Sequence, residues 1–382
     1  PTLCPEESVN FDGFDMICLG EGEEALLELC DKLQKSADIT SIRNLWVKQG
    51  SRIYKNEIRP LINDLDNLPF ADRSIFSSES LIEDDKLGAT FVMVSRGCPY
   101  SCSYCSNQAF HELYRGKGSY LRFRSVGNII QELDSLKSRY DAIIFHDDIL
   151  PLNKEWLRGF AKQYKADIGL PFVCNLRVEL AQKDSLELLK DAGCIQVCLG
   201  VESGNDFIRK EIMHRNMSRE QIIQAFHACR RLGIKTKSFN MVGLPFEDMG
   251  KVLETIKLNV EADPDIIQVS IFYPYPGTEL FEMSRKNNFI TNKNLVSYFD
   301  GSILSLPTMN QNQIYFARKR FVKMFKRYKA YKKLPYFIAK FMENITDAIF
   351  KSRLMAKHYV VQRNFSQYLK VKRRKNKRNI KP

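Results

Sequence analysis

The sequence lacks any run of about 18 uncharged apolar residues, so we predict no membrane-spanning helix. It also lacks the charged start and short apolar stretch of a secretory signal peptide. Because residue 1 is Pro1, we interpret the chain as a fragment or processed piece of a longer protein. Its 382 residues, 44% of them hydrophobic, suffice to bury a large core and predict more than one domain.

The cysteines lack the pattern of a disulfide framework. Seven of the ten are scattered, and most of these lie in apolar runs such as FVCNL and IQVCLG, where a reduced cysteine packs as a small hydrophobe. This usage predicts a reducing, cytoplasmic environment. Cys194 and Cys198 are separated by three residues, but both fall within one apolar strand pattern. We therefore expect them in the core rather than on a metal.

Acidic residues are scarce toward the C-terminus. From Asn310 onward there are 22 Lys and Arg but only Glu343 and Asp347 as acids, a balance of +20, whereas the preceding residues have a balance of −7. This is not a uniformly basic nucleic-acid-binding protein. Three interpretations of the basic region stay open: a solvated helical cap, a contact with anionic lipid or a lipid-like substrate, and nucleic-acid binding. The acidic body argues against the last, so we expect no specific nucleic-acid partner.

One short segment, 95–108 with the sequence SRGCPYSCSYCSNQ, concentrates three cysteines within eight positions: Cys98, Cys102 and Cys105. A structural zinc site requires four closed ligands, and iron–sulfur clusters usually take four thiolates. Three ligands in one loop leave a coordination position open, which favours a chemical role. The alternative is a structural zinc site completed by a distant cysteine or by His111.

From residue 89 onward, apolar strand patterns alternate with helical patterns. The expected strands cover residues 89–96, 141–148, 171–177, 194–202, 236–244 and 265–276. They show little polar alternation, which is typical of parallel strands covered on both faces. Six βα units in about 200 residues predict the α/β class and a partial (β/α)6 TIM-like barrel. Polar motifs follow several of these strands, at the end where barrel enzymes carry their chemistry.

The barrel pattern has different neighbours on its two sides. Residues 13–20 indicate a buried strand and residues 23–36 an amphipathic helix, together the last unit of an α/β domain. After residue 319 two helical apolar stripes follow, separated by Pro335, and we expect the final KVKRRKNKRNIKP to be disordered. We therefore expect a Rossmann-like remnant in 1–55, a linker in 56–84, the barrel in 85–290 and a basic helical region in 291–382.

The cysteine segment resembles the signature of the radical S-adenosylmethionine (SAM) superfamily, C-x3-C-x2-C with an aromatic residue, here Tyr104, before the third cysteine. The resemblance implies an enzyme in which three thiolates hold a [4Fe–4S] cluster and SAM chelates its fourth iron. An electron from the cluster then cleaves SAM to a 5′-deoxyadenosyl radical, which abstracts hydrogen from the substrate. It also implies a low-potential electron donor such as a flavodoxin or ferredoxin.

Further segments resemble the same family at the ends of expected strands. Asp147 and Asp148, in FHDD, match the polar groups that the family places near the SAM amino group; the alternative is a helix N-cap. Glu202, in GVESGNDFIRKEIMHR, would bond the SAM ribose or amino group, with Ser203 nearby. Arg215 would pair with the SAM carboxylate, unless it is a solvated charge at a helix end.

Two later strand ends resemble family segments as well. In FNMVGLPFE, Gly243 would let the backbone approach the adenine, although glycine there can also serve only a turn. In FYPYPGTEL, Tyr273 or Tyr275 would face the substrate or pack in the core. This aromatic segment and the basic C-terminal helices favour a large apolar or anionic small molecule, such as a tetrapyrrole, lipid or polyketide intermediate, over a peptide or tRNA.

The N-terminal residues resemble the cobalamin-binding branch of the superfamily, through PTLCPEE, DMICLGEGEEALLEL and RPLINDLDNLPFADRSIF. In this branch a Rossmann-like domain holds cobalamin above the barrel mouth, and the reactions are methylation, ring closure or ring contraction. Only the last strand and helix of that domain are expected here, with Gly20, Glu21 and Gly22 near the corrin tail, and cobalamin is expected in the full-length parent. The alternatives are a hydrogen abstractor or methylthiotransferase without cobalamin, and a non-catalytic metal-binding module.

Overall fold

The computed structural model describes residues 1–75, 88–150, 153–291 and 301–362. The chain divides into two compact units, which we call the first and the second unit. The first comprises Pro1–Leu176, Glu187–Ile195 and Pro274–Met283; the second comprises Arg177–Leu186, Gln196–Tyr273 and Ser284–Pro382. Within the described residues, no helix combines the length and the apolar character needed to cross a lipid bilayer.

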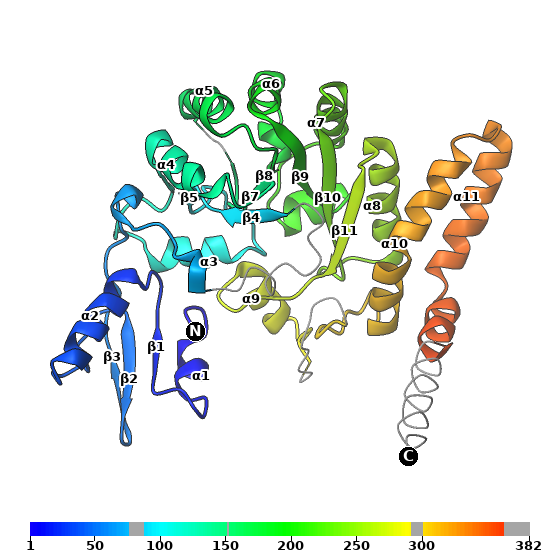
Figure 1. Cartoon of the computed structure of the whole chain (residues 1–382). Helices are drawn as coiled ribbons and strands as arrows, with labels where there is room; N and C mark the ends of the chain where they lie inside the picture. Colours follow the sequence, from blue (N-terminus) through cyan, green and yellow to red (C-terminus); the bar gives the residue numbers. More distant parts are fainter. Residues whose placement is uncertain (76–87, 151–152, 292–300, 363–382) are drawn as a thin grey trace, which may run out of the picture. The chain divides into compact units, whose positions relative to one another are not determined.

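Three parallel strands form the centre of the first unit: β4 (Ala89–Val92), β7 (Ala142–Phe145) and β8 (Phe172–Leu176). β7 lies between the other two, with Ala142 opposite Ala89. Two helices cover these strands on one side (Figure 1): α4 (Val126–Leu136) and α5 (Lys154–Gln163). Phe145 and Phe172 meet Phe160 of α5 in edge-to-face contacts, which bind the helix to the strands.

The second unit also has three parallel strands: β9 (Cys194–Glu202, from Gln196 onward in this unit), β10 (Lys235–Val242) and β11 (Ile266–Ile271). β10 lies in the middle, and a register shift on it between Phe239 and Asn240 brings Asn240 opposite Glu202. Two helices pack against each other along these strands (Figure 1): α7 (Arg219–Arg231) and α8 (Met249–Ala262). Ser218 and Gln221 form a capping box that starts α7.

All six expected barrel strands are present, which confirms the α/β class. Three more helices belong to the βα units: α3 (Ser106–Leu113), α6 (Lys183–Ala192) and α9 (Glu279–Lys286). The expected strand 89–96 is broken in two. Its last residues form β5 (Ser95–Arg96), which pairs antiparallel with β6 (Arg122–Phe123). Cys194 and Cys198 are buried within β9, as expected for core residues.

The N-terminal residues differ from the single strand and helix expected there. The elements are α1 (Pro5–Val9), β1 (Met16–Cys18), α2 (Glu23–Gln34), β2 (Leu45–Gln49) and β3 (Arg52–Lys55). β1 pairs antiparallel with β2, and β2 with β3, so these residues form an antiparallel sheet instead of a parallel α/β unit. The missed hairpin had a sequence signal: Leu45 and Val47 are buried and alternate with more exposed neighbours ahead of Gly50.

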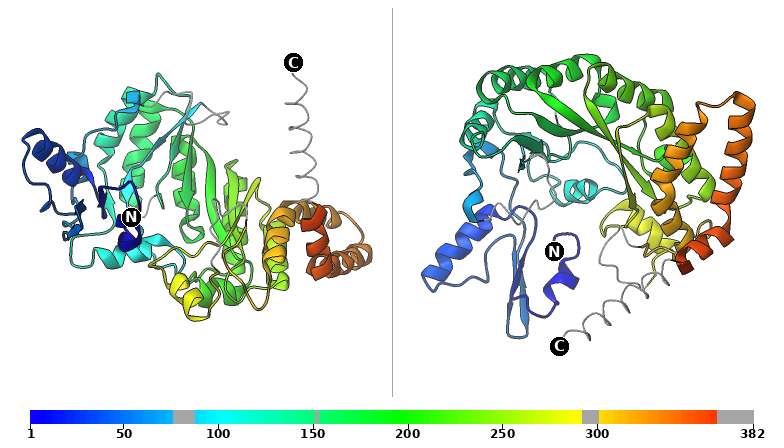
Figure 2. Two further views of the ribbon diagram at one scale, coloured as in Figure 1. Left: turned by 90° about the horizontal axis from the view of Figure 1, so that it is seen from below. Right: turned by 45° about the vertical axis from the view of Figure 1, so that its right-hand side comes forward.

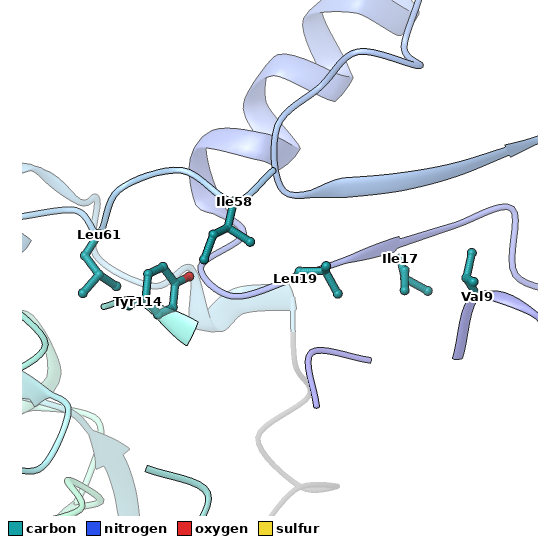
Figure 3. Close-up of a cluster of buried hydrophobic side chains, with 6 residues drawn as sticks. All are labelled: Val9, Ile17, Leu19, Ile58, Leu61 and Tyr114. Carbon is teal, nitrogen blue, oxygen red and sulfur yellow. The ribbon is translucent and has the colours of Figure 1, made fainter. Parts of the chain in front are cut away.

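A hydrophobic cluster joins the N-terminal residues to the chain that follows the cysteine segment (Figure 3). Ile17 and Leu19 lie in it with Ile58 and Leu61, and Tyr114, just after α3, completes it. The N-terminal residues therefore belong to the first unit. The domain boundary expected at residue 55 stays a prediction. The boundary expected at residue 84 lies outside the described residues.

Two long helices form the C-terminal region predicted by the apolar stripes: α10 (Gln311–Tyr331) and α11 (Tyr336–Lys351). They lie side by side, with α10 packed on α8 and β11 and with α11 packed on α10 and α8 (Figure 2). The stripe on α10, which includes Phe321 and Phe325, is buried. The stripe on α11, from Ile338 to Ile349, is exposed. The predicted disordered segment 370–382 lies outside the described residues.

Candidate functional site

The three motif cysteines lie in a loop between β5 and α3 of the first unit. Cys102 is buried, whereas Cys98 and Cys105 are half-buried. The backbone N–H of Cys105 donates to the Cys102 carbonyl at 3.0 Å, and Cys105 is also the residue before the first turn of α3. A tight turn and a helix start thus fix the spacing of the second and third cysteines.

Two thiols of this loop, Cys98 and Cys105, have a raised pKa. Burial raises the pKa of Cys98 to about 11, and the charges of Cys105, Asp148 and Cys102 act in the same direction. Burial also raises the pKa of Cys105, whose sulfur accepts a hydrogen bond from Asn107 Nδ2 at 3.5 Å. Such thiols stay protonated until a nearby cation compensates their negative charge.

This set of donors fits a [4Fe–4S] cluster. Soft thiolates are the usual ligands of such clusters, and an N–H group directed at a ligand sulfur is a common supporting contact. Within the part of the chain that the structure describes, no three His, Cys, Asp or Glu side chains converge on one metal ion. A four-iron cluster takes each thiolate at a different iron, so its ligands need not converge on one ion. His111, the alternative zinc ligand, packs edge-on against Tyr120.

Asp147, which follows β7, holds the chain at the entrance to the cysteine loop. It is buried, and its carboxylate accepts hydrogen bonds from the backbone N–H groups of Val94 at 3.0 Å and Ser95 at 2.6 Å. Burial raises its pKa to about 6, which these hydrogen bonds oppose. The helix N-cap alternative does not apply, because α5 is capped by Asn153. The structure therefore assigns Asp147 a supporting role at the loop.

Asp148 and Tyr104 are the other two residues predicted from this loop. Asp148 is exposed, and its charge contributes to the raised pKa values of Cys98, Cys105 and Tyr120. Tyr104 is half-buried. Asp148 is thus the aspartate of the pair whose carboxylate lies near the thiols and is open to solvent.

In the second unit, Glu202 and Arg215 lie together. Glu202 ends β9 with a φ of 63°, which is uncommon for a residue with a side chain. A Cβ atom on Gly200 would lie 2.5 Å from Glu202 Oε1 and 3.2 Å from Arg215 Nη2, so both side chains pass over the same backbone position. Arg215 Nη2 also donates to the Gly200 carbonyl at 2.7 Å.

A second guanidinium, which the sequence analysis missed, belongs to this group. Burial raises the pKa of Glu202 to about 7, against the opposing charges of Arg215 and Arg177. Arg177 is buried and binds Glu179 at 2.6 Å. The signal for it was its place at the end of the expected strand 171–177, where the other polar motifs also lie. The cluster offers a carboxyl group beside two guanidinium groups, a combination that suits a ligand carrying both charges.

Ser203 and Gly243 shape the loops after β9 and β10. Ser203 is buried, and its carbonyl accepts a hydrogen bond from the fully buried Arg209 at 2.9 Å. Gly243 has a φ of 85°, and a Cβ atom there would lie 2.9 Å from Ile314 of α10. Glycine at this position is therefore required for the turn and for the packing of α10. The Glu247 carboxylate accepts a hydrogen bond from the Gly243 N–H at 2.6 Å, a supporting role that the sequence did not indicate.

Gly20, Glu21 and Gly22 line a cavity of about 420 Å³ within the first unit. The cavity is also lined by Arg96, Gly97, Phe110, Tyr114, Tyr120 and Arg122. Because Arg96 and Gly97 directly precede Cys98, this cavity borders the cysteine loop. The loop predicted near the corrin tail and the start of the loop predicted to hold the cluster therefore line the same cavity.

The side chain of Glu21 is bound within the protein. Its carboxylate accepts hydrogen bonds from Arg96 at 2.9 Å and from Arg122 at 2.8 Å, and its N–H donates to the Tyr114 hydroxyl at 2.7 Å. A Cβ atom on Gly20 would collide with the same hydroxyl. Glu21 thus connects the N-terminal loop to residues on both sides of the cysteines. These partners are 75 to 101 positions away, so no local sequence pattern indicates them.

Comparison with known families places part of the chain. Residues 92–258 match the radical SAM superfamily. The matched range contains the cysteine loop together with Asp147, Glu202, Arg215 and Gly243. The match implies a [4Fe–4S] cluster and SAM as cofactors.

Individual relatives agree with this assignment. The chain is 30% identical to an uncharacterized methyltransferase of Pyrococcus horikoshii over 290 residues, 74% of this chain and 61% of the relative. It is 26% identical to the anaerobic magnesium-protoporphyrin IX monomethyl ester cyclase of Rubrivivax gelatinosus over 278 residues, 70% of this chain and 48% of that one. The chain thus spans about half to three-fifths of these relatives.

A solved structure shows the same fold. The cobalamin-dependent SAM radical enzyme OxsB, with aqua-cobalamin and SAM bound, superimposes with a TM-score of 0.63 at 16% identity. The match covers 92% of this chain and 57% of OxsB. This likeness confirms the fold predicted for the barrel residues.

Proposed function

We propose that this protein is an enzyme that cleaves SAM reductively at a [4Fe–4S] cluster held by Cys98, Cys102 and Cys105. The observation that carries the proposal is the set of three cysteines in one loop, with the radical SAM signature and within the matched range 92–258. When bound, the cluster would supply the electron that breaks the sulfonium bond, received from a donor such as a flavodoxin or ferredoxin. The chain itself supports the loop through Asn107 at the Cys105 sulfur and through Asp147 at the entrance to the loop.

We assign the amino-acid end of SAM to the charged cluster of the second unit. Arg215 and Arg177 carry guanidinium groups, which bind carboxylates with paired hydrogen bonds. The Glu202 carboxyl would accept hydrogen bonds from the ammonium or ribose of SAM, and a positive ammonium would favour its ionised form. Asp148 and Tyr104 are further candidates for SAM contact, and the turn at Gly243 is the candidate for the adenine.

The net reaction we propose is a cobalamin-dependent methylation or ring formation on a small molecule. Relatives of this chain are named as a methyltransferase and as a ring-forming cyclase. The match to cobalamin-dependent OxsB extends over more of the chain than the barrel residues 85–290. The cavity beside the cysteine loop is lined by Gly20, Glu21 and Gly22, the residues expected near cobalamin. A hydrogen abstractor or methylthiotransferase without cobalamin is the alternative, and a non-catalytic metal-binding module is the rival outside catalysis.

Anaerobic reconstitution with iron and sulfide tests the cluster. We expect about four irons per chain and, with a reductant and SAM, release of 5′-deoxyadenosine. Cys98→Ala, Cys102→Ala or Cys105→Ala should abolish both, because each removes one thiolate. Cys30→Ala, at an exposed cysteine outside the motif, is the matched control and should preserve both. Tight zinc binding without SAM cleavage would instead support the non-catalytic module.

The products from SAM then separate the candidate reactions. Loss of the methyl group leaves S-adenosylhomocysteine, whereas hydrogen abstraction leaves 5′-deoxyadenosine. With the full-length parent, which we expect to hold cobalamin, added cobalamin should increase SAM consumption, and methylation should in addition yield S-adenosylhomocysteine. Release of 5′-deoxyadenosine alone, at a rate that cobalamin does not change, would favour the hydrogen abstractor.

A further inference from the structure

α11 carries a broad apolar stripe on the side that faces solvent. Phe337 is 85% exposed, Phe341 63% and Ile345 42%, at intervals of four residues along the helix. The same face adds Ile338, Met342 and Ile349, all exposed. A helix of a globular protein normally turns such a stripe toward the core. A continuous apolar face of this length on the surface indicates an interaction site.

The helix is fixed in this orientation by its opposite side. Asp347 accepts from Lys257 of α8 at 2.7 Å and from the Tyr328 hydroxyl of α10. Thr346 is buried and is hydrogen-bonded to Tyr331 at 2.9 Å. Because the polar residues of α11 are held against its neighbours, the apolar stripe is directed outward by the fold. Figure 2 shows α11 on the far side of α10 from the strands of the second unit.

Positive charge is frequent along the chain on and next to α11. Lys340 and Lys351 lie on α11, and further cations precede and follow it: Lys332, Lys333, Arg353 and Lys357. Of the two acids on the helix, Asp347 is neutralised by Lys257, which leaves Glu343. Residues 363–382 add nine Lys and Arg and no acid. An apolar face with a cationic border is the composition of a helix that lies in the interface of an anionic bilayer.

A cavity of about 290 Å³ between α10 and α11 adjoins this face. Phe316, Met324 and Phe350 form its apolar part, and Ile349 joins it to the exposed stripe. Three cations line it as well: Arg320, Lys323 and Arg327. Apolar walls beside guanidinium and ammonium groups suit an acyl chain whose phosphate headgroup stays at the rim.

We propose that α11 docks this protein on the surface of an anionic lipid bilayer, with Phe337, Phe341 and Ile345 inserted among the headgroups. A bilayer interface provides both things that the face lacks, namely apolar cover for the aromatic side chains and negative charge for the lysines. A second copy of the chain would bring two like-charged borders together, which is unfavourable. Docking places the protein beside membrane-dissolved small molecules, whatever reaction it performs on them.

Vesicle sedimentation tests the proposal with the full chain. We expect binding to phosphatidylcholine vesicles that contain phosphatidylglycerol, weaker binding to phosphatidylcholine alone, and loss of binding with rising salt. The triple variant Phe337→Ser, Phe341→Ser, Ile345→Ser should bind at least about tenfold more weakly, because it removes the inserted apolar groups. The matched control is Phe11→Ser with Phe14→Ser, two exposed aromatic residues in the first unit, and it should bind like the unmodified chain.

A charge variant separates the electrostatic attraction to the bilayer from the insertion of apolar side chains. Lys333→Gln with Lys340→Gln should weaken binding to the anionic vesicles severalfold and leave binding to neutral vesicles unchanged. Circular dichroism checks that each variant is folded. Equal vesicle binding by the triple variant and the unmodified chain overturns the proposal. A second result would also overturn it: the unmodified chain does not bind vesicles but self-associates in sedimentation equilibrium, and the triple variant does not self-associate. The exposed face would then bind a second copy of the chain.

Discussion

At the scale of single residues, the second unit places two glutamates where their charge is unfavourable. Burial raises the pKa of Glu202 to about 7 and that of Glu247 to about 8. The charges of Arg215 and Arg177 favour the ionised form of Glu202, and a positively charged ligand group would favour it further. Glu247 accepts backbone hydrogen bonds on one oxygen, while its Oε1 is buried and makes no hydrogen bond. We interpret Glu202 as a binding group and Glu247 as a support for the turn.

Glu247 should make stability depend on pH. Its pKa rises from 4.5 to about 8 on folding, so between these values the folded chain holds a proton that the unfolded chain has lost. The free energy of unfolding therefore falls as pH rises through this window. Glu247→Gln mimics the protonated form, and at pH 8 to 9 it should be more stable than the unmodified chain, by on the order of 3 kcal/mol at most, with little difference at pH 4.5.

Urea unfolding at several pH values measures this difference. Glu254→Gln, at an exposed position in the same unit, is the control and should leave the pH dependence unchanged. A Glu247→Gln variant whose stability parallels that of the unmodified chain at every pH would show that Glu247 keeps an ordinary pKa.

At the scale of elements, the pair β5–β6 shows how the cysteine loop is anchored. Arg96 and Arg122 lie directly opposite each other in this antiparallel pair, where like charges are destabilising. Glu21 bridges them, and its loop is held in turn by Tyr114. The N-terminal loop therefore stabilises the strand that leads into Cys98, in addition to lining the neighbouring cavity.

Removing the Glu21 carboxylate, which binds both Arg96 and Arg122, should reduce stability more than removing the Glu23 carboxylate, which binds only Arg96. Glu21→Gln leaves the buried Arg122 without its carboxylate, and we expect a loss of roughly 2–4 kcal/mol in the free energy of unfolding. Glu23→Gln removes the more exposed pair with Arg96 and should cost less than about 1 kcal/mol. Urea unfolding gives both values, and the iron bound after reconstitution should fall only for Glu21→Gln. Equal losses of unfolding free energy for the two variants would show that Glu21 does not anchor the cysteine loop.

At the scale of the whole molecule, charge is segregated along the chain. The residues before Asn310 have a formal balance of −7, while those from Asn310 onward have +20. Long-range attraction to anionic surfaces should therefore come from the C-terminal region. In the second unit, α10 is fixed by buried aromatic residues, whereas the stripe on α11 is exposed, so the two helices have different tasks.

Deletion of residues 370–382 should separate long-range attraction from catalysis. It removes eight Lys and Arg and no acid, and it lowers the formal net charge from +13 to +5. We expect elution from a cation exchanger at clearly lower salt and an unchanged rate of 5′-deoxyadenosine release, because the segment lies outside the barrel residues. A lower rate at saturating SAM would show that these residues contribute to the active site.

The sequence by itself determined the features that depend on neighbouring residues. Apolar runs located all six barrel strands and the helices α10 and α11, because burial and helical periodicity act over a few positions. The C-x3-C-x2-C spacing predicts the cluster loop for the same reason, and the strand ends predict Glu202 as a binding residue. Both lie within the range that matches the radical SAM superfamily.

Only the tertiary structure decided the features that depend on distant partners. The apolar stripe on α11 has the periodicity of a buried face, yet no chain segment in the described residues covers it. The bridge from Glu21 to Arg122 spans 101 positions, and the antiparallel pairing of β1 with β2 depends on a partner strand that local pattern does not name. The local pattern shows which residues of a segment are apolar or charged. Which side chains lie against them depends on segments far away in the sequence, and therefore on the fold as a whole.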